Sequence, residues 1–117
     1  MSKKLLIPLY GNDVAPRFDL ATEVLIVSLD ENKERIHEKT VVLPQASAEQ
    51  LCHLILTEEA QVVMCGGIEE EYYQYLRWKR VEVLDSVIGP YEAALERFCK
   101  GSLHAGEILY KEGGRGS

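Results

Sequence analysis

The 117-residue chain carries 13 Lys and Arg against 19 Asp and Glu, a net charge of −6, and 46% of its residues are hydrophobic. This length and composition are typical of one globular domain with its own core, and no apolar run approaches the ~20 residues that a membrane helix needs. Because Lys and Arg are scattered apart from a cluster at 77–80, a phosphate-binding surface is hard to build, and nucleic acid is not expected as a partner.

The cysteines and the start of the chain predict a cytoplasmic protein. Cys52, Cys65 and Cys99 are an odd number without a CxxC pair, which disfavours a disulfide framework and a self-contained metal site. The apolar run Leu5–Ile7 ends at Pro8, too early for a signal peptide. We therefore expect neither secretion nor membrane insertion.

Three strands are expected in the first part of the chain. Lys4–Tyr10 is apolar enough for a central strand, with Pro8 near its end because proline lacks an amide donor. A loop rich in turn-forming residues follows at 11–19, and alternating residues predict two further strands over 23–29 and 35–43. The charges of the third strand are typical of a sheet edge.

Helices and strands alternate in the rest of the chain. Ser47 and Gln50 form a capping box that begins a helix running to about Glu59. The further elements expected are a strand from Val62, a helix over 69–78, a strand over 80–84 and a helix that begins at Pro90 and ends at Gly101. This order predicts an α/β fold of ribonuclease H-like type, in which a three-strand meander and two parallel strands form a mixed five-stranded sheet with helices on its faces.

No linker or repeat divides the chain. We expect a single domain over residues 1–109 and a flexible C-terminal tail over 110–117, where glycine dominates.

A binding site is expected where the strand from Val62 ends. Its apolar run stops at Cys65, Gly66 and Gly67, and Glu69–Glu71 follow in the first turn of the next helix. In an open α/β sheet, ligands bind at the carboxyl ends of parallel strands. The Cys65 thiol could be a thiolate and a soft metal ligand, or equally a small buried side chain that fills the strand end.

Four motifs give the chain a family resemblance: Ile7-Pro8, Val14-Ala15-Pro16-Arg17-Phe18-Asp19, Cys65-Gly66-Gly67-Ile68 and Gly101-Ser102-Leu103. Over roughly residues 4–106 the pattern resembles the dinitrogenase iron-molybdenum cofactor biosynthesis family, the NifX-like domains. The resemblance implies a ribonuclease H-like fold and, for some members, non-covalent binding of an iron-sulfur or iron-molybdenum cluster.

On this interpretation the chain is a stand-alone carrier that receives a metallocluster from a donor protein or passes it to an acceptor. We expect cofactor contacts from Asn12, Asp13, Arg17, Cys65, Gly66 and Gly67, with Cys65 as the metal ligand. The chain departs from its family at Glu69–Glu71, where members commonly carry a further glycine. These carboxylates would repel an anionic cluster unless they point away from it.

The alternative is a protein-interaction or regulatory module without a cofactor. Tyr72, Tyr73, Tyr75 and Trp78 cannot all face inward from one helix, and exposed aromatic residues beside arginines resemble an interaction hot spot. The competing interpretation of the same residues is ordinary packing of an amphipathic helix.

The other candidate residues favour structural roles. Cys52 and Cys99 are expected to pack, and Arg17 and Asp19 to form an ion pair that holds their loop, with cargo contact as the second interpretation. His53 is expected at the solvated flank of its helix, and whether His53, His37 or His104 provides a ligand stays open.

Enzymatic activity is not expected. Ribonuclease H-like nucleases hold metal ions with carboxylates, one of them on the first strand, but Lys4–Tyr10 contains no acid. The sequence also has no P-loop or GxGxxG motif.

Overall fold

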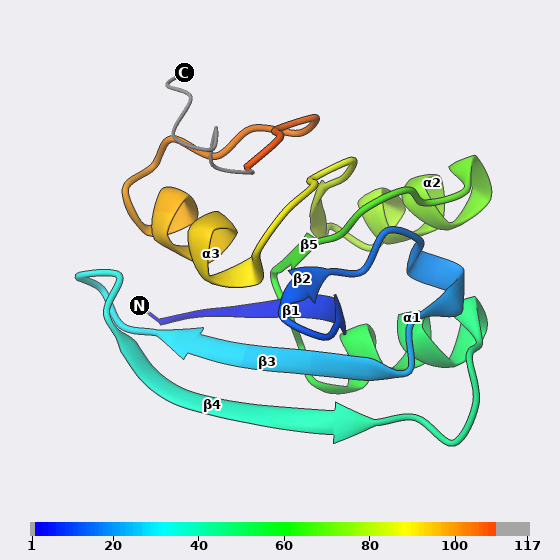
Figure 1. Cartoon of the computed structure of the whole chain (residues 1–117). Helices are drawn as coiled ribbons and strands as arrows, with labels where there is room; N and C mark the ends of the chain where they lie inside the picture. Colours follow the sequence, from blue (N-terminus) through cyan, green and yellow to red (C-terminus); the bar gives the residue numbers. More distant parts are fainter. Residues whose placement is uncertain (1, 110–117) are drawn as a thin grey trace.

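The computed structural model describes residues 2–109, which form a mixed sheet and three α-helices (Figure 1). The strands are β1 (Lys3–Tyr10), β2 (Asp13–Val14), β3 (Glu23–Leu29), β4 (Arg35–Val42), β5 (Val62–Met64) and β6 (Glu82–Leu84). The helices are α1 (Ala48–Thr57), α2 (Glu70–Trp78) and α3 (Tyr91–Cys99), with a short 3-10 helix, η1, at Phe18–Leu20. None of the helices within 2–109 is long and apolar enough to span a bilayer.

The strand order is β4-β3-β1-β5-β6, which confirms the predicted meander followed by parallel strands. β1 is antiparallel to β3 and parallel to β5, and β5 is parallel to β6. The predicted number of strands was wrong, because the sheet has six rather than five. The additional strand, β2, lies within the predicted loop, where Gly11 at φ +63° turns the chain so that Asp13 and Val14 pair with the end of β1.

Pro8 lies near the end of the first strand, as predicted, because β1 ends two residues later at Tyr10. The Pro8 carbonyl accepts a hydrogen bond from the Ala15 amide at 2.8 Å. Because the N and C=O of one residue point to the same side of a strand, the missing donor of Pro8 also faces that side. On that side, β1 pairs with β5 at Leu5 and Leu6 and with β2 from Leu9 onward. The proline therefore lies where β1 changes partners, at little cost to the ladder.

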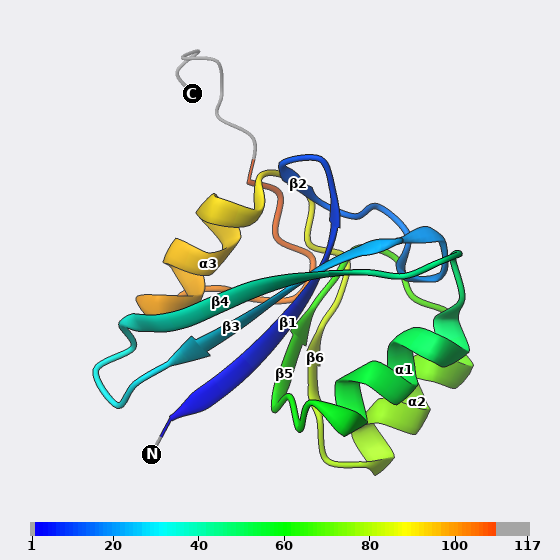
Figure 2. The same ribbon diagram turned by 90° about the horizontal axis from the view of Figure 1, so that it is seen from below.

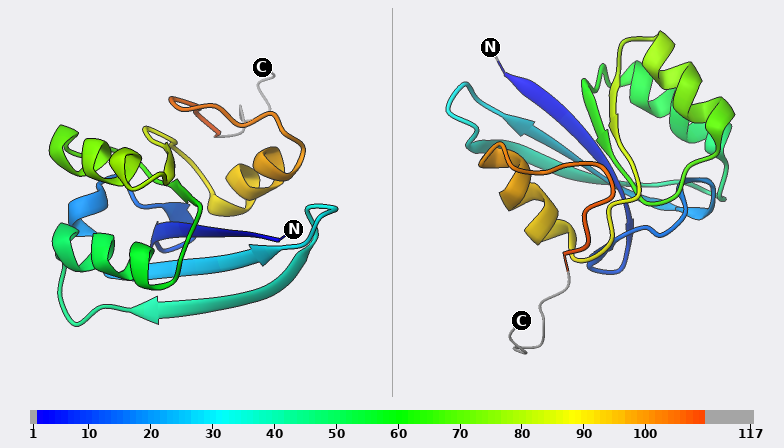
Figure 3. Two further views of the ribbon diagram at one scale, coloured as in Figure 1. Left: turned by 180° about the vertical axis from the view of Figure 1, so that it is seen from behind. Right: turned by 90° about the horizontal axis from the view of Figure 1, so that it is seen from above.

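The helices cover both faces of the sheet, with α1 and α2 together on one face and α3 on the other (Figures 2 and 3). Ser47 caps α1 as predicted, since its Oγ accepts from the Gln50 amide at 3.1 Å. Two buried clusters follow the alternation of β1, in which Leu6 belongs to the α1 and α2 side and Leu5 and Ile7 to the α3 side. The sheet is thus the middle of three layers.

Two of the element boundaries that differ from those predicted have a clear local cause. The last strand was expected to begin at residue 80, but Arg80 has φ +69° and forms the turn after α2, so β6 begins at Glu82. Pro90 was expected as the first helical residue and is instead the N-cap of α3, with ψ +137°. Gly101 follows α3 at φ +75°, as its predicted role requires. The predicted tail at 110–117 lies outside the described residues.

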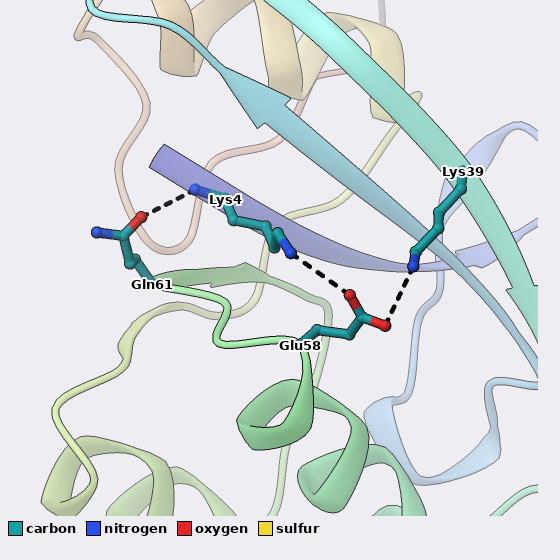
Figure 4. A network of polar contacts seen from close by, with 4 residues as sticks. All are labelled: Lys4, Lys39, Glu58 and Gln61. Carbon is teal, nitrogen blue, oxygen red and sulfur yellow. Dashed lines mark hydrogen bonds and ion pairs between the residues drawn. The ribbon is translucent and has the colours of Figure 1, made fainter. Parts of the chain in front are cut away.

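β4 is the edge strand that its charges predicted, and it is tied to α1 through Glu58 (Figure 4). One Glu58 carboxylate oxygen lies 3.2 Å from Lys39 Nζ of β4, and the other lies 3.5 Å from Lys4 Nζ of β1. The Lys4 amide donates to Gln61 Oε1 at 2.9 Å. One carboxylate therefore joins the edge strand, a central strand and the end of a helix.

Candidate functional site

The two most specific sequence motifs are docked against each other. The Gly67 amide donates to the Pro16 carbonyl at 2.7 Å, and the Phe18 amide donates to the Gly67 carbonyl at 2.8 Å. A Cβ on Gly66 would lie 2.4 Å from the Ala15 carbonyl oxygen and 2.5 Å from that of Pro16. Only glycine permits this approach, so Gly66 allows the 15–18 loop to lie on the end of β5.

The side chains of this loop hold it in place. Phe18 is buried in the core, 6.4 Å from the Tyr72 ring by centroids. Arg17 binds Asp19 through two bonds, Nε to Oδ1 at 3.1 Å and NH2 to Oδ2 at 2.7 Å, which confirms the predicted ion pair. The hydrogen bond from Arg17 lowers the pKa of Asp19 below its ordinary value. Arg17 is therefore already paired within its own loop.

A pocket of about 250 Å³ opens beside this contact, at the carboxyl ends of β5 and β6. We call it the glycine pocket; its lining residues are Asp13, Val14, Pro16, Gly66, Gly67, Ser86, Val87, Ile88 and Gly89. The Ser86 amide donates to the Gly66 carbonyl at 2.9 Å, and the Val87 amide donates to the Cys65 carbonyl at 3.0 Å. The loop after β6 thus forms the second wall of the glycine pocket, and the two docked motifs form the first.

The structure brings together three of the six predicted cofactor-binding residues. Asp13, Gly66 and Gly67 line the glycine pocket. Arg17 lines a separate, mostly apolar hollow of about 340 Å³ formed with β1 and the η1 region. Asn12 is exposed and contributes its carbonyl to the Tyr91 amide at 3.0 Å, which anchors α3 to the β1–β2 hairpin.

Cys65 lies beneath the pocket rather than on its surface. Its side chain is fully buried in the core cluster on the α1 and α2 side of the sheet. Burial raises the pKa of the Cys65 thiol far above its ordinary value, and the negative charge of Asp85 raises it further. A neutral, enclosed thiol is a poor metal ligand. This placement argues against the predicted ligand role and favours the packing alternative.

The surroundings of the pocket are acidic. Asp13 and Asp85 are both half-buried, and Asp85 Oδ2 accepts from Ser86 Oγ at 3.1 Å. The hydrogen bond to Asp19 and the charge of Asp19 raise the pKa of Arg17, and the charge of Glu69, the N-cap of α2, raises it further. Across residues 2–109, no three His, Cys, Asp or Glu side chains converge in a way that could hold a metal ion.

The sequence interpretation missed the residues of the second wall. Ser86 adopts φ +58°, which is unusual for a residue with a side chain, and Gly89 adopts φ +127°. The available signal was the position of Asp85–Gly89 after a second parallel strand, because neighbouring parallel strands end at the same edge of a sheet. That argument would have added the loop to the predicted site.

The remaining candidate residues lie elsewhere. Cys52 is buried in the core, as predicted, and burial together with Glu49 raises its pKa to about 11. His53 is exposed beside it and borders a groove of about 440 Å³ between α1 and α2. We call this the helical groove; its lining residues are Glu49, Cys52, His53, Leu56, Glu71, Tyr72 and Tyr75.

The two other histidines are exposed, His37 on the edge strand β4 and His104 after α3. Cys99 is half-buried and packs against the cluster on the α3 side, in line with its predicted packing role. Neither histidine lines the glycine pocket or the helical groove.

Solved structures share this fold. The structure of PH0822 matches with a TM-score of 0.79 at 19% identity, over 87% of this chain and 93% of that one. A protein from Methanocaldococcus jannaschii, provisionally assigned as a dinitrogenase, matches with a TM-score of 0.72 at 22% identity, over 88% and 93%. A Thermotoga protein provisionally assigned as NifB matches with a TM-score of 0.67 at 18% identity, over 95% and 99%.

These identities are low, so the structural matches show the fold alone, and a search of curated proteins found no match. The sequence comparison goes further, because the family described as "Dinitrogenase iron-molybdenum cofactor" matches residues 3–101. That range contains the 14–19 loop, the Cys65–Gly67 turn and all the lining residues of the glycine pocket. The chain therefore belongs to the dinitrogenase iron-molybdenum cofactor family, the NifX-like domains.

Proposed function

We propose that this domain binds an iron-sulfur or iron-molybdenum type metallocluster as cargo and carries it between a donor and an acceptor protein. The observation that carries the proposal is the convergence of the family motifs on the glycine pocket. Gly66 and Gly67 from the turn after β5 and Asp13 from the β1–β2 hairpin meet there, although more than 50 residues separate them in sequence. Membership of the family supplies the chemical class of the cargo.

The pocket would hold its cargo through shape and backbone contacts. Three of its lining residues are glycines, which let a ligand approach the main chain closely. No thiolate lines the pocket, so the cargo would keep its own sulfide and organic ligands. A ligand role for Cys65 would require loss of a proton from a buried thiol and an opening of the contact between Gly66 and Pro16.

We further infer a non-enzymatic, cytoplasmic protein of ribonuclease H-like fold. The strand order supports this classification of the fold. β1 and β5 carry no acidic residue, so the carboxylates with which a nuclease of this fold would hold metal ions on these strands are missing. Incubation with an RNA–DNA hybrid and Mg²⁺ or Mn²⁺ tests the inference, and metal-dependent cleavage that survives purification would contradict it.

The proposal is tested by anaerobic titration of the protein with a cluster, followed by visible absorption. Gly67 does not have a positive φ, and a Cβ there meets only the Pro16 oxygen at 3.4 Å, so Gly67→Leu can fold while filling the pocket. We expect Gly67→Leu to weaken binding strongly, and Asp13→Asn to strengthen binding of an anionic cluster, more so at low salt. Glu96→Gln on α3 is the matched control.

Binding by Gly67→Leu equal to that of the wild type would place the cargo elsewhere, and absence of binding by the wild type would contradict the carrier function. The second candidate function, a protein-interaction or regulatory module without a cofactor, would then be favoured. One observation supports it independently, because Trp78 at the end of α2 is 75% exposed. Large exposed aromatic residues are enriched in protein interfaces.

A further inference from the structure

Five residues of α2 and its C-cap form one stripe, and three of them, Glu71, Tyr72 and Tyr75, line the helical groove. Glu71, Tyr72, Tyr75, Trp78 and Lys79 follow the spacing of neighbours on a helix surface. Their contacts show that the second half of this stripe is continuous. Lys79 Nζ lies 4.9 Å from the Trp78 ring centroid and 5.7 Å from that of Tyr75, and these two rings are 6.5 Å apart. We call these residues the α2 stripe.

The α2 stripe is complementary to itself when it is reversed. Tyr75 lies at its centre, with Tyr72 three residues before and Trp78 three residues after, about 4.5 Å along the axis in each direction. Four residues from the centre, Glu71 provides a negative charge on one side and Lys79 a positive charge on the other. In an antiparallel pair of α2 helices related by a two-fold axis at Tyr75, the glutamate of each copy faces the lysine of the other copy. In the same way, Tyr72 of each copy faces Trp78 of the other.

The stripe also offers apolar surface and room for a partner. Tyr75 is 39% exposed and Trp78 75% exposed, whereas Leu76, about 100° further around α2 than Tyr75, is fully buried. The helical groove beside the stripe is lined by the carboxylates Glu49 and Glu71 and by the Tyr72 ring. An indole flanked by a lysine therefore complements the acidic and aromatic lining of this groove.

We propose that α2 is a self-association surface and that its partner is a second copy of this chain, bound antiparallel across a two-fold axis near Tyr75. Lys79 then pairs with the partner's Glu71, and Trp78 packs on the partner's Tyr72 at the mouth of the helical groove. Both contacts occur twice, as two-fold symmetry requires. α1 and α2 lie together on one face of the sheet, so two copies meet through this helical layer (Figure 2).

This association is weak and salt-sensitive. A single helical face with part of a groove covers less than the ~1,200 Å² of total buried surface typical of stable complexes. Its charge pairs are exposed and are screened as ionic strength rises. The proposal does not depend on cluster binding, because none of the residues of the α2 stripe lines the glycine pocket.

The test is sedimentation equilibrium of the whole chain over a wide concentration range at low and high salt. Glu71→Lys and Lys79→Glu each place like charges together twice, and each should weaken self-association about tenfold or more. The double variant with both changes reverses the two charges on one chain, and self-association should return to within about threefold of the wild type. Trp78→Ala should weaken it at unchanged net charge.

Glu96→Lys and Lys100→Glu make the same charge changes on the exposed surface of α3 and should leave association unchanged. Circular dichroism checks that each variant is folded. A wild-type chain that stays monomeric at every concentration overturns the proposal. So does a dimer that either single reversal leaves intact, or that the double variant fails to restore, because the two copies would then meet through another surface.

Discussion

At the scale of single residues, Gly66 and Gly67 are adjacent and yet differ in what they tolerate. A Cβ at Gly66 would be 2.4 Å from the Ala15 oxygen, whereas one at Gly67 meets nothing nearer than 3.4 Å. We expect Gly66→Ala to lower the free energy of unfolding by about 2 kcal/mol, because the 15–18 loop must move, and Gly67→Ala to change it by less than about 0.5 kcal/mol. Urea denaturation measures both, and equal effects would contradict the close contact of the two motifs.

Cys65 is a second residue whose role a substitution can decide. Serine would place a hydroxyl in an apolar cluster without a known partner, so we expect Cys65→Ser to lower the free energy of unfolding by about 1–3 kcal/mol and to leave cluster affinity unchanged. Cys65→Ala is the comparison that removes the sulfur without adding a polar group. Loss of cluster binding by both folded variants would restore Cys65 as the metal ligand.

At the scale of elements, the ties between β1, β4 and α1 depend on the charge of Glu58. Its carboxylate is 19% exposed, and the hydrogen bond from Lys39, followed by the charges of Lys39 and Lys4, lowers its pKa below the ordinary value. A group whose pKa is lower in the folded state adds stability above its unfolded pKa, and this stability is lost as the pH falls through the folded pKa.

We therefore expect Glu58→Gln to lower the free energy of unfolding at pH 7 by about 0.5–1 kcal/mol, the range for partly exposed ion pairs. The difference from the wild type should shrink as the pH falls below the ordinary glutamate pKa and disappear once Glu58 is protonated. Chemical denaturation across this pH range measures it. Glu96→Gln, which removes a more exposed pair with Lys100 at 3.6 Å, should have a smaller effect.

The elements with a strong local signal could be predicted from the sequence. The apolar run in 23–29, the capping box at Ser47 and the apolar stripe of α1 are each local signals, although β3 is buried on both faces rather than on alternate residues. β2 and the second wall of the glycine pocket could not be predicted in this way. Their conformation depends on partners far along the chain, such as the Gly66 carbonyl that accepts from Ser86.

For the candidate site, too, some features could be predicted from the sequence and others could not. The sequence predicted the edge of the sheet at which the pocket lies, because that follows from strand order. It left open whether Cys65 faces the core, because an apolar run that is covered on both faces has no alternation of apolar and polar residues to show which way each side chain points. In the structure Cys65 continues the alternation of β5, since Val63 and Cys65 belong to one buried cluster and Met64 to the other.

At the scale of the whole molecule, the segment after α3 closes the fold. Leu103 is 8% exposed and packs in the cluster on the α3 side. Ile108 forms a parallel bridge with Ile88, next to the glycine pocket, and a Glu107 carboxylate oxygen lies 2.8 Å from an Arg97 nitrogen. Residues 103–109 therefore pack against the rest of the described chain, although no helix or strand of the sheet passes through them.

This placement gives a test of the predicted domain boundary. A chain that ends at residue 109 keeps these contacts, and we expect its free energy of unfolding to stay within about 0.5 kcal/mol of the full chain if 110–117 is the flexible tail that its composition predicts. A chain that ends at residue 102 loses the Leu103 side chain and the bridge to Ile88, and burial of a leucine alone contributes about 1.5–3 kcal/mol. Thermal and urea denaturation compare the two. A large loss on removal of 110–117 would show that the domain extends to the end of the chain.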